Sequence, residues 1–162
     1  MLAKYVSPDY LYYNEVNYVD VLDLRMREAM PGFTPAFLVD TGRNGAPEKR
    51  EDCSAWCNPR GAGIGFAPTT KTADARIDAY YWLKTPGESD GCTEELPGGG
   101  KCPRFDRDCA DPASIGSKYG EPRAPEAGLW FHYQMEELAT NANLGDISSF
   151  QEDRGSCGTV QD

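Results

Sequence analysis

Two stretches of the chain carry the hydrophobic pattern of an α-helix. The first runs from about residue 15 to residue 30, and Pro31-Gly32 ends it. Its apolar positions are Val16, Val19, Leu22, Leu24 and Met26. The second runs from about Pro125 to Asn141. Its candidates for burial are Leu129, Phe131, Met135 and Leu138. Each helix should lay one apolar face on a core.

Two short apolar runs between these helices predict strands. Residues 36–40, Ala-Phe-Leu-Val-Asp, form a continuous apolar run, which is typical of a buried parallel strand. Residues 78–83 are mostly aromatic or apolar and suit a pleated, buried surface. The order of helix, strand, loop, strand, loop and helix predicts an α/β fold. The strands are too few to close a (β/α) barrel, which takes roughly 250 residues.

Two long segments have no periodic pattern. Residues 46–76 are irregular, and residues 91–123 contain Gly98-Gly99-Gly100 together with four prolines. A structureless loop of this length inside a domain is usually functional. Residues 1–145 are therefore expected to form one domain, and residues 146–162 a loosely structured C-terminal tail.

Charged residues cluster where the second strand ends. Lys84, Glu88 and Asp90 follow it within seven residues, interrupted by Pro86-Gly87. Barrel enzymes keep their chemistry at the carboxyl ends of buried strands, so this cluster is a candidate site. A solvated turn after a strand fits the same pattern, and the pattern alone does not separate the two.

Composition narrows the class of protein. The chain has 162 residues, 40% hydrophobic and 26% charged, which is enough for one globular domain with a core. Its net charge of −10 argues against nucleic acid and anionic membranes as partners, because phosphate groups require a basic face. No apolar run is long enough to span a bilayer.

The cysteines indicate disulfides rather than a metal site. Six cysteines occur without a C-x-x-C pair, and the chain has one histidine, so neither zinc nor any other cofactor is expected. Disulfides point to an oxidising compartment, hence to a secreted protein. The first residues, Met1-Leu-Ala-Lys-Tyr-Val, lack a signal-peptide core, which suggests that the true N-terminus lies upstream.

A series of short motifs occurs in one order along about residues 8–145. The motifs are Phe37-Leu-Val-Asp-Thr-Gly-Arg43-Asn-Gly45, Trp56-Cys57-Asn58, Gly61-Ala-Gly-Ile-Gly65, Trp82-Leu-Lys84, Gly87-Glu-Ser-Asp-Gly91, Arg104-Phe-Asp106, Ala124-Pro-Glu-Ala-Gly128 and Leu138-Ala-Thr-Asn-Ala-Asn143. Together they resemble glycoside hydrolase family 6, the cellobiohydrolases and endoglucanases that act on β-1,4-glucan. The resemblance covers the C-terminal half of the family's catalytic domain.

The resemblance implies a fold and a reaction. The fold is the C-terminal part of a distorted, incomplete (β/α) barrel with long disulfide-tied loops, and the glycan lies over the strand ends. The reaction is hydrolysis of cellulose with inversion, which needs one carboxylic acid and one carboxylate base. The family's acid lies in the N-terminal half. The isolated chain is therefore expected to be inactive, and to be insoluble or dimeric because the strand at 36–40 keeps an open apolar edge.

The resemblance also assigns roles to individual residues. Asp90 looks like the catalytic base, and Lys84 should favour its charged form. Lys84 and Glu88 look like the pair that hydrogen-bonds the sugar, and Arg43 like the arginine that holds the carboxylates. Trp56 looks like a sugar-stacking platform, and the adjacent Asn58 is placed with the substrate-binding residues. The residues expected to be structural are Tyr80, Tyr81, Trp130 and His132.

The family's cysteines imply that Cys57 pairs with Cys109. Cys92 and Cys102 are expected to close the glycine-rich hairpin between them, and Cys53 to pair with Cys157 or with a cysteine of the N-terminal half. In the family, exo-acting members roof the cleft with a long loop. The length of residues 91–123 therefore implies a chain-end, processive cellobiohydrolase.

Two other classes fit part of these observations. A noncatalytic, secreted carbohydrate-binding or interaction domain would also have disulfides, tryptophans and acidic residues, but it has no need for the cluster of Lys84, Glu88 and Asp90. A small disulfide-rich structural protein is disfavoured by the strand–loop–strand pattern and the large apolar helices.

Overall fold

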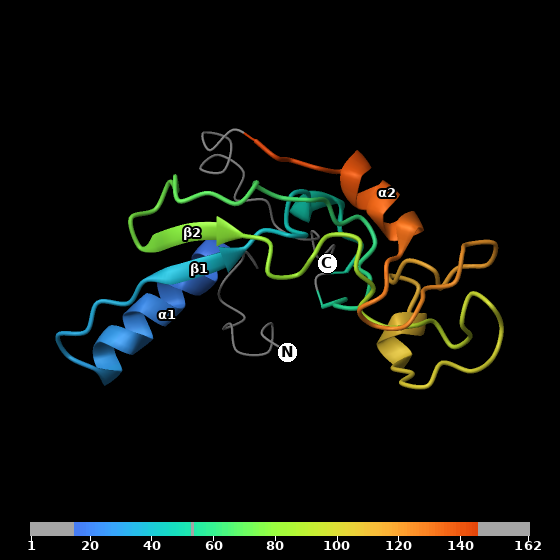
Figure 1. Ribbon diagram of the computed structural model, residues 1–162. Helices are drawn as coiled ribbons and strands as arrows, with labels where there is room; N and C mark the ends of the chain where they lie inside the picture. Colours follow the sequence, from blue (N-terminus) through green and yellow to red (C-terminus); the bar gives the residue numbers. More distant parts are fainter. Residues whose placement is uncertain (1–14, 53, 146–162) are drawn as a thin grey trace, which may run out of the picture.

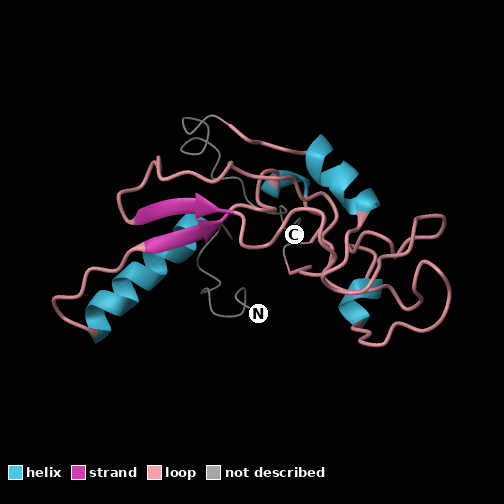
Figure 2. Cartoon of the chain, in the orientation of Figure 1, coloured by secondary structure: helices cyan, strands magenta, loops and turns pink. Residues whose placement is uncertain are grey.

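A parallel pair of strands and two helices frame a loop-rich chain. The computed structural model describes residues 15–52 and 54–145. The elements in chain order are α1 (Glu15–Ala29), β1 (Phe37–Asp40), the 3-10 turn η2 (Pro47–Lys49), β2 (Ile77–Tyr81), the 3-10 turn η3 (Arg107–Ala110) and α2 (His132–Thr140). Figure 2 shows how much of the chain is loop. The expected C-terminal tail lies outside the described residues.

β1 and β2 form a two-stranded parallel sheet, and the expected α/β class is confirmed. The register pairs Phe37 with Ile77 but Leu38 with Ala79, so Asp78 is an extra residue that shifts the ladder. Because side chains alternate along a strand, this shift turns both Ile77 and Tyr80 toward the same face. Both are buried on that face.

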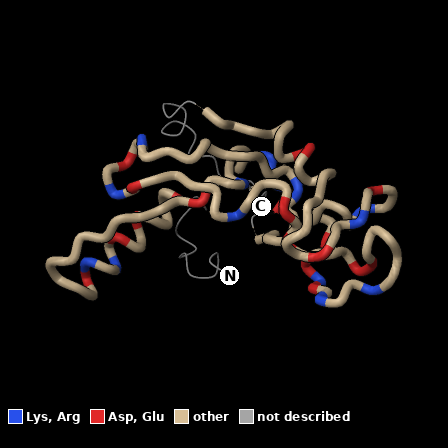
Figure 3. The backbone as a smooth tube through the Cα atoms, in the orientation of Figure 1, with Lys and Arg blue, Asp and Glu red and all other residues tan. Residues whose placement is uncertain are grey.

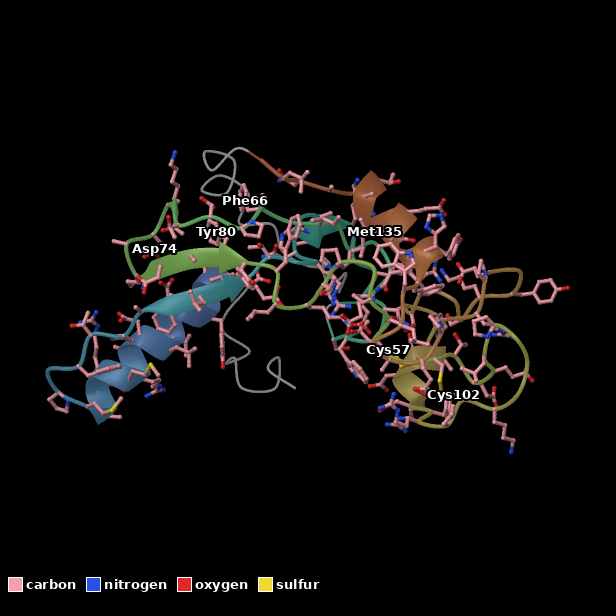
Figure 4. The ribbon with its side chains drawn as sticks, viewed as in Figure 1. Cys57, Phe66, Asp74, Tyr80, Cys102 and Met135 are labelled. Atoms are coloured by element: carbon pink, nitrogen blue, oxygen red, sulfur yellow. A yellow bond between two sulfur atoms is a disulfide. The ribbon has the colours of Figure 1, made fainter. Side chains whose placement is uncertain are left out.

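One face of the sheet is covered by α1 and by the segment around Phe66. The buried core there is made of Val19, Val39, Phe66, Ile77 and Tyr80, with Phe37 packed against it. The rings of Phe66 and Tyr80 stack with their centroids 5.5 Å apart (Figure 4). The helical pattern around residues 15–30 is confirmed, but Leu24 is exposed because it lies off the face that contacts the sheet.

The other face of the sheet is bare within the described residues. Leu38 is 64% exposed and Tyr81 is 52% exposed, although both strands were expected to be buried and Tyr81 to be a core residue. These expectations are wrong for the same reason. Both side chains lie on the face opposite Val39 and Tyr80, where the described residues leave more than half of each exposed.

α2 is shorter than its sequence pattern predicts. The helix begins at His132 rather than near Pro125, because residues 126–129 form a turn and Trp130 then bridges to Glu88 in the loop after β2. Gly128 has a φ of +86°, which favours glycine and breaks any helix there. Leu129 and Trp130 are consequently exposed, against the expectation of burial, and His132 is also exposed.

α2 still anchors its end of the molecule. Leu138 is fully buried with Ala62 and Ile64, and Met135 packs against that group. A second small core nearby contains Ile115, Ala124 and Phe131. In Figure 1, α2 lies beside the loops that follow β2. The bridge between Trp130 and Glu88 therefore joins the start of the helix to those loops.

The loop at 91–123 is held by polar contacts rather than by regular structure. Arg60 donates two hydrogen bonds to Glu121, at 2.8 and 2.9 Å, and both side chains are largely buried. Burial opposes the charge of Glu121, but the bonds from Arg60 and from the backbone N–H groups of Gly116 and Lys118 win, so its pKa is lowered. This pair ties the segment after Pro59 to the loop.

Acidic and basic residues are both scattered along the tube in Figure 3. In the described part of the chain, neither helix has the length and apolar character that a bilayer crossing demands.

The Leu138→Ala variant is expected to lower the free energy of unfolding by about 2–5 kcal/mol, because truncation leaves a cavity where the side chain is fully buried. Urea unfolding at one fixed protein concentration measures the change. The matched control is Leu129→Ala, at an exposed leucine, with an expected effect within about 0.5 kcal/mol. Equal costs for the two variants would contradict this packing.

Candidate active site

The carboxyl ends of β1 and β2 meet at one edge of the sheet because the strands are parallel. Asp40 closes β1 and lies where the two following loops cross. Its carboxylate accepts a 3.0 Å hydrogen bond from the backbone N–H of Gly42 and another of 3.0 Å from that of Lys84. A Cβ at Gly42 would overlap the carbonyl of Lys84, so the two loops touch backbone to backbone.

Asp90 is the most heavily contacted charge at this edge. Arg43 donates a short hydrogen bond to its Oδ2, and Lys84 lies with Nζ 3.1 Å from its Oδ1. The backbone N–H of Asn58 donates to Oδ2 at 2.8 Å. The side chain of Asp90 is 10% exposed. Two cations and a backbone donor therefore hold this carboxylate in one orientation.

Asn58 completes a reciprocal pair with Asp90. Its side-chain oxygen accepts a 2.8 Å hydrogen bond from the backbone N–H of Asp90, while its Nδ2 donates to the carbonyl of Gly91 at 3.0 Å. Its φ is +40°, a left-handed conformation that asparagine tolerates better than most residues. Asn58 is fully buried, so both ends of its amide are used inside the protein.

Ser89 also helps to hold the charged cluster in place, although the sequence patterns did not single it out. The residue is fully buried, and its hydroxyl donates to the carbonyl of Pro125 at 2.8 Å. Its own carbonyl accepts from Lys84 Nζ at 3.3 Å. Ser89 thus couples the loop after β2 to the segment that precedes α2. The sequence patterns did not assign a role to Asp40 or Ser89. Their positions, at the end of a strand and between two charged residues, could have indicated one.

Glu88 lies at the outer side of the cluster. Its Oε1 is 3.5 Å from Lys84 Nζ, and its side chain is 37% exposed, far more than that of Asp90. The structure thus brings Arg43, Lys84, Glu88 and Asp90 together as one cluster. Lys84 contacts the carboxylates of both Glu88 and Asp90. A polar ligand at this edge would therefore find a hydrogen-bond donor, Lys84, with an acceptor on each side of it.

Trp56 lies at the border of the same region. Its indole N–H donates to Asp108 of η3 at 2.7 Å, and the residue is 42% exposed. The adjacent Cys57 forms a disulfide with Cys109, as the family resemblance implied, and both cysteines are buried. Figure 4 shows Cys57 beside η3. The disulfide and the indole hydrogen bond together fix the orientation of the ring.

The other cysteines fall into two groups. Cys92 and Cys102 form a disulfide, and the expected hairpin between them is present, with Glu95 bridged to Lys101. Cys53 and Cys157 lie outside the described residues, so their pairing stays a prediction. Glu126 approaches Cys92 and Cys102, but both sulfurs are in the disulfide and are not thiolate ligands for a metal ion.

Comparison with known proteins identifies this arrangement. The profile of Glycosyl hydrolases family 6 matches residues 3–142, which is most of the chain. The chain belongs to glycosyl hydrolase family 6. Family 6 membership confirms the resemblance stated from the motifs.

The curated relatives include an exoglucanase and cellobiohydrolases. The chain is 40% identical over 131 residues to Exoglucanase 3 of Agaricus bisporus, covering 81% of this chain and 27% of that protein. It is 39% identical over 131 residues to the probable 1,4-beta-D-glucan cellobiohydrolase C of Aspergillus fumigatus, covering 80% and 26%. The chain therefore spans about a quarter of the length of these relatives.

Solved structures of family 6 share this fold. The catalytic core domain of the cellobiohydrolase Cel6A from Chaetomium thermophilum matches with a TM-score of 0.68 at 38% identity, over 86% of this chain and 35% of that one. Cellobiohydrolase II (Cel6A) from Humicola insolens, in complex with glucose and cellotetraose, matches with a TM-score of 0.68 at 33% identity, over the same shares.

Asn58→Ala is expected to cost about 2–4 kcal/mol of unfolding free energy, because the backbone N–H of Asp90 and the carbonyl of Gly91 both lose a buried partner. Hydrogen exchange at the Asp90 amide measures the local effect directly and should become much faster. The matched control is Asn143→Ala, since Asn143 is exposed and its side chain accepts a single 3.5 Å contact from Gly145. Unchanged protection of the Asp90 amide in Asn58→Ala would contradict the role of this pair.

Proposed function

We propose that this chain carries the base side of a site that hydrolyses β-1,4-glucosidic bonds of cellulose with inversion. The observation that carries the proposal is the environment of Asp90. Arg43, Lys84 and the backbone N–H of Asn58 hold its carboxylate in one orientation at the carboxyl edge of a parallel sheet. A base must stay ionised and fixed in place to take a proton from water.

The neighbouring side chains suit the sugar and the framework. Lys84 and the half-exposed Glu88 offer a donor and acceptors to the hydroxyl groups of the sugar on one side of the bond. The indole of Trp56, held by Asp108, provides a stacking surface for a glucose ring. Asn58 is fully buried, so we assign it to positioning Asp90 rather than to the sugar contact expected from the resemblance.

The acid side of the reaction comes from another part of a family 6 domain. Inverting glycosidases place their two carboxyl groups about 6.5–9.5 Å apart, which leaves room for the attacking water. In the family this acid belongs to the N-terminal half of the catalytic domain. The parent protein is proposed to be secreted, which agrees with the two disulfides of the described residues and with the fungal relatives.

The isolated chain is expected to release no cellobiose from cellulose, because proton donation to the leaving oxygen is worth roughly 10²–10⁴-fold and needs a positioned donor. The same chain joined to the preceding part of the Exoglucanase 3 catalytic domain should be active. Replacing Asp90 by Asn in that joined protein should remove turnover while cello-oligosaccharide binding remains. Product release by chromatography and binding by calorimetry measure the two quantities.

This experiment also separates the enzyme from the alternative of a binding domain. A noncatalytic carbohydrate-binding domain would bind in both forms and turn over in neither. The matched control is Asp78→Asn, an exposed strand aspartate away from the site, which should leave turnover unchanged. Sedimentation of the isolated chain should show association through the bare face of Leu38 and Tyr81, and a stable monomer would count against that part of the proposal.

We further propose that the parent enzyme acts from chain ends. The loop at 91–123 is tied at Cys109 to Cys57 and stiffened by the disulfide between Cys92 and Cys102. A stiff loop over the cleft admits a chain by its end and hinders internal attack. The active joined protein should therefore release soluble sugar from carboxymethyl-cellulose with little early fall in viscosity. Shortening the 93–101 hairpin should increase the fall in viscosity per bond cut, and an early collapse of viscosity without any shortening would refute this mode.

A further inference from the structure

Trp130 lies directly beside the charged cluster. It faces Glu88 in an antiparallel bridge, flanked by hydrogen bonds from Phe131 N–H to the carbonyl of Gly87 at 2.8 Å and from Ser89 N–H to the carbonyl of Leu129 at 2.9 Å. This is the pattern of a non-hydrogen-bonded pair, in which the two side chains project from the same face and lie close together. Trp130 and Glu88 are therefore direct neighbours across this bridge.

The indole of Trp130 differs from the other two in having a free polar edge. The N–H groups of Trp56 and Trp82 donate to Asp108 and to the carbonyl of Phe66. Trp130 is 57% exposed, and among the described residues its indole N–H has no hydrogen-bond partner. Part of the ring packs on the backbone of Gly87, where an added Cβ would lie 2.6 Å from the ring. This contact holds one side of the ring in place. It is a fixed aromatic surface with an open donor.

A hollow of about 370 Å³ extends from this ring. Its apolar wall includes Trp130, Tyr133, Pro97 and Pro122. Its polar rim is made of Arg123, His132 and Glu136. Pro97 belongs to the hairpin closed by Cys92 and Cys102, while Tyr133 and the rim residues His132 and Glu136 belong to α2. The hollow thus lies between the hairpin closed by Cys92 and Cys102 and the start of α2, and Trp130 at its border is the bridge partner of Glu88.

The chemistry of the hollow fits a neutral polar chain with apolar faces. Aromatic rings and prolines match the C–H face of a pyranose ring, and rim groups of both polarities match its hydroxyl groups. The rim mixes a cation, an anion and a histidine, and the whole chain has a net charge of −10, so neither an anionic nor a strongly cationic ligand is favoured. Trp130 lines the hollow and is also the bridge partner of Glu88, so it is the residue that lies between the hollow and the cluster.

We propose that Trp130 and this hollow form a second binding site for a β-glucan chain, beyond the residues that contact the sugar at the point of cleavage. The inference rests on the proposed function, because it takes the same glucan as ligand. A chain that passes Glu88 stacks one of its rings on the indole of Trp130, and the indole N–H donates to a sugar oxygen. The next part of the chain then lies against Tyr133 and the prolines.

The test uses the 162-residue chain and the joined protein carrying Asp90→Asn, which binds without turnover. Cellohexaose is titrated while the indole N–H signals are followed by NMR, and single Phe replacements of Trp56 and Trp130 assign them. The expected result is a saturable shift of the Trp130 signal in both proteins. A Trp130 signal that stays unmoved at saturation overturns the proposal, including the case in which the joined segment covers the ring.

Affinity gives a second readout. Trp130→Ala should weaken cellohexaose binding about three- to ten-fold, the range expected for loss of one aromatic stacking contact. The matched control is Tyr119→Ala, which removes a fully exposed aromatic that does not line the hollow and should leave affinity unchanged. Equal affinity in Trp130→Ala and its parent, with binding that still depends on Trp56, overturns this inference alone. Absence of cellohexaose binding in the parent proteins overturns the proposed function and this inference with it.

Discussion

The site depends on one reciprocal contact, in which Asn58 and Asp90 each donate a backbone N–H to the side chain of the other. Each bond is 2.8 Å long, and Asn58 is fully buried, so water does not compete for this pair. The contact fixes the carboxylate from one side, while Arg43 and Lys84 fix it from the other. A loop with few regular hydrogen bonds thereby presents a charge in one orientation.

The surrounding loops are rigid without being regular. Two strands supply an edge, but most of the residues at that edge come from segments held by single strong contacts. Asp40 accepts hydrogen bonds from the backbones of two loops, at Gly42 and Lys84. The ion pair of Arg60 and Glu121 holds the loop at 91–123, and the disulfide of Cys57 holds the segment that carries Trp56. Such contacts act between residues far apart in sequence, so each one removes a large part of the freedom of the unfolded chain.

Sequence patterns predicted the local elements better than the surroundings of each residue. The strand ends and the charged cluster follow from short apolar runs with polar residues after them, and these are local properties. The start of α2, the exposure of Leu38 and the burial of Asn58 are not local. They depend on a strand pairing with Trp130, on a face that no described element covers, and on a partner 32 residues away. Periodicity alone carries no information about such partners.

The contacts of Asp90 come from three stretches, around residues 43, 58 and 84, and the first two lie 47 and 32 residues from Asp90 in sequence. The site is therefore complete only when these stretches have been brought together, so an ordered Asp90 indicates that the loops around it are in place. For the same reason a short peptide that carries the Lys84–Asp90 segment would have the right side chains and no fixed charge, so this chemistry cannot be grafted as a linear motif.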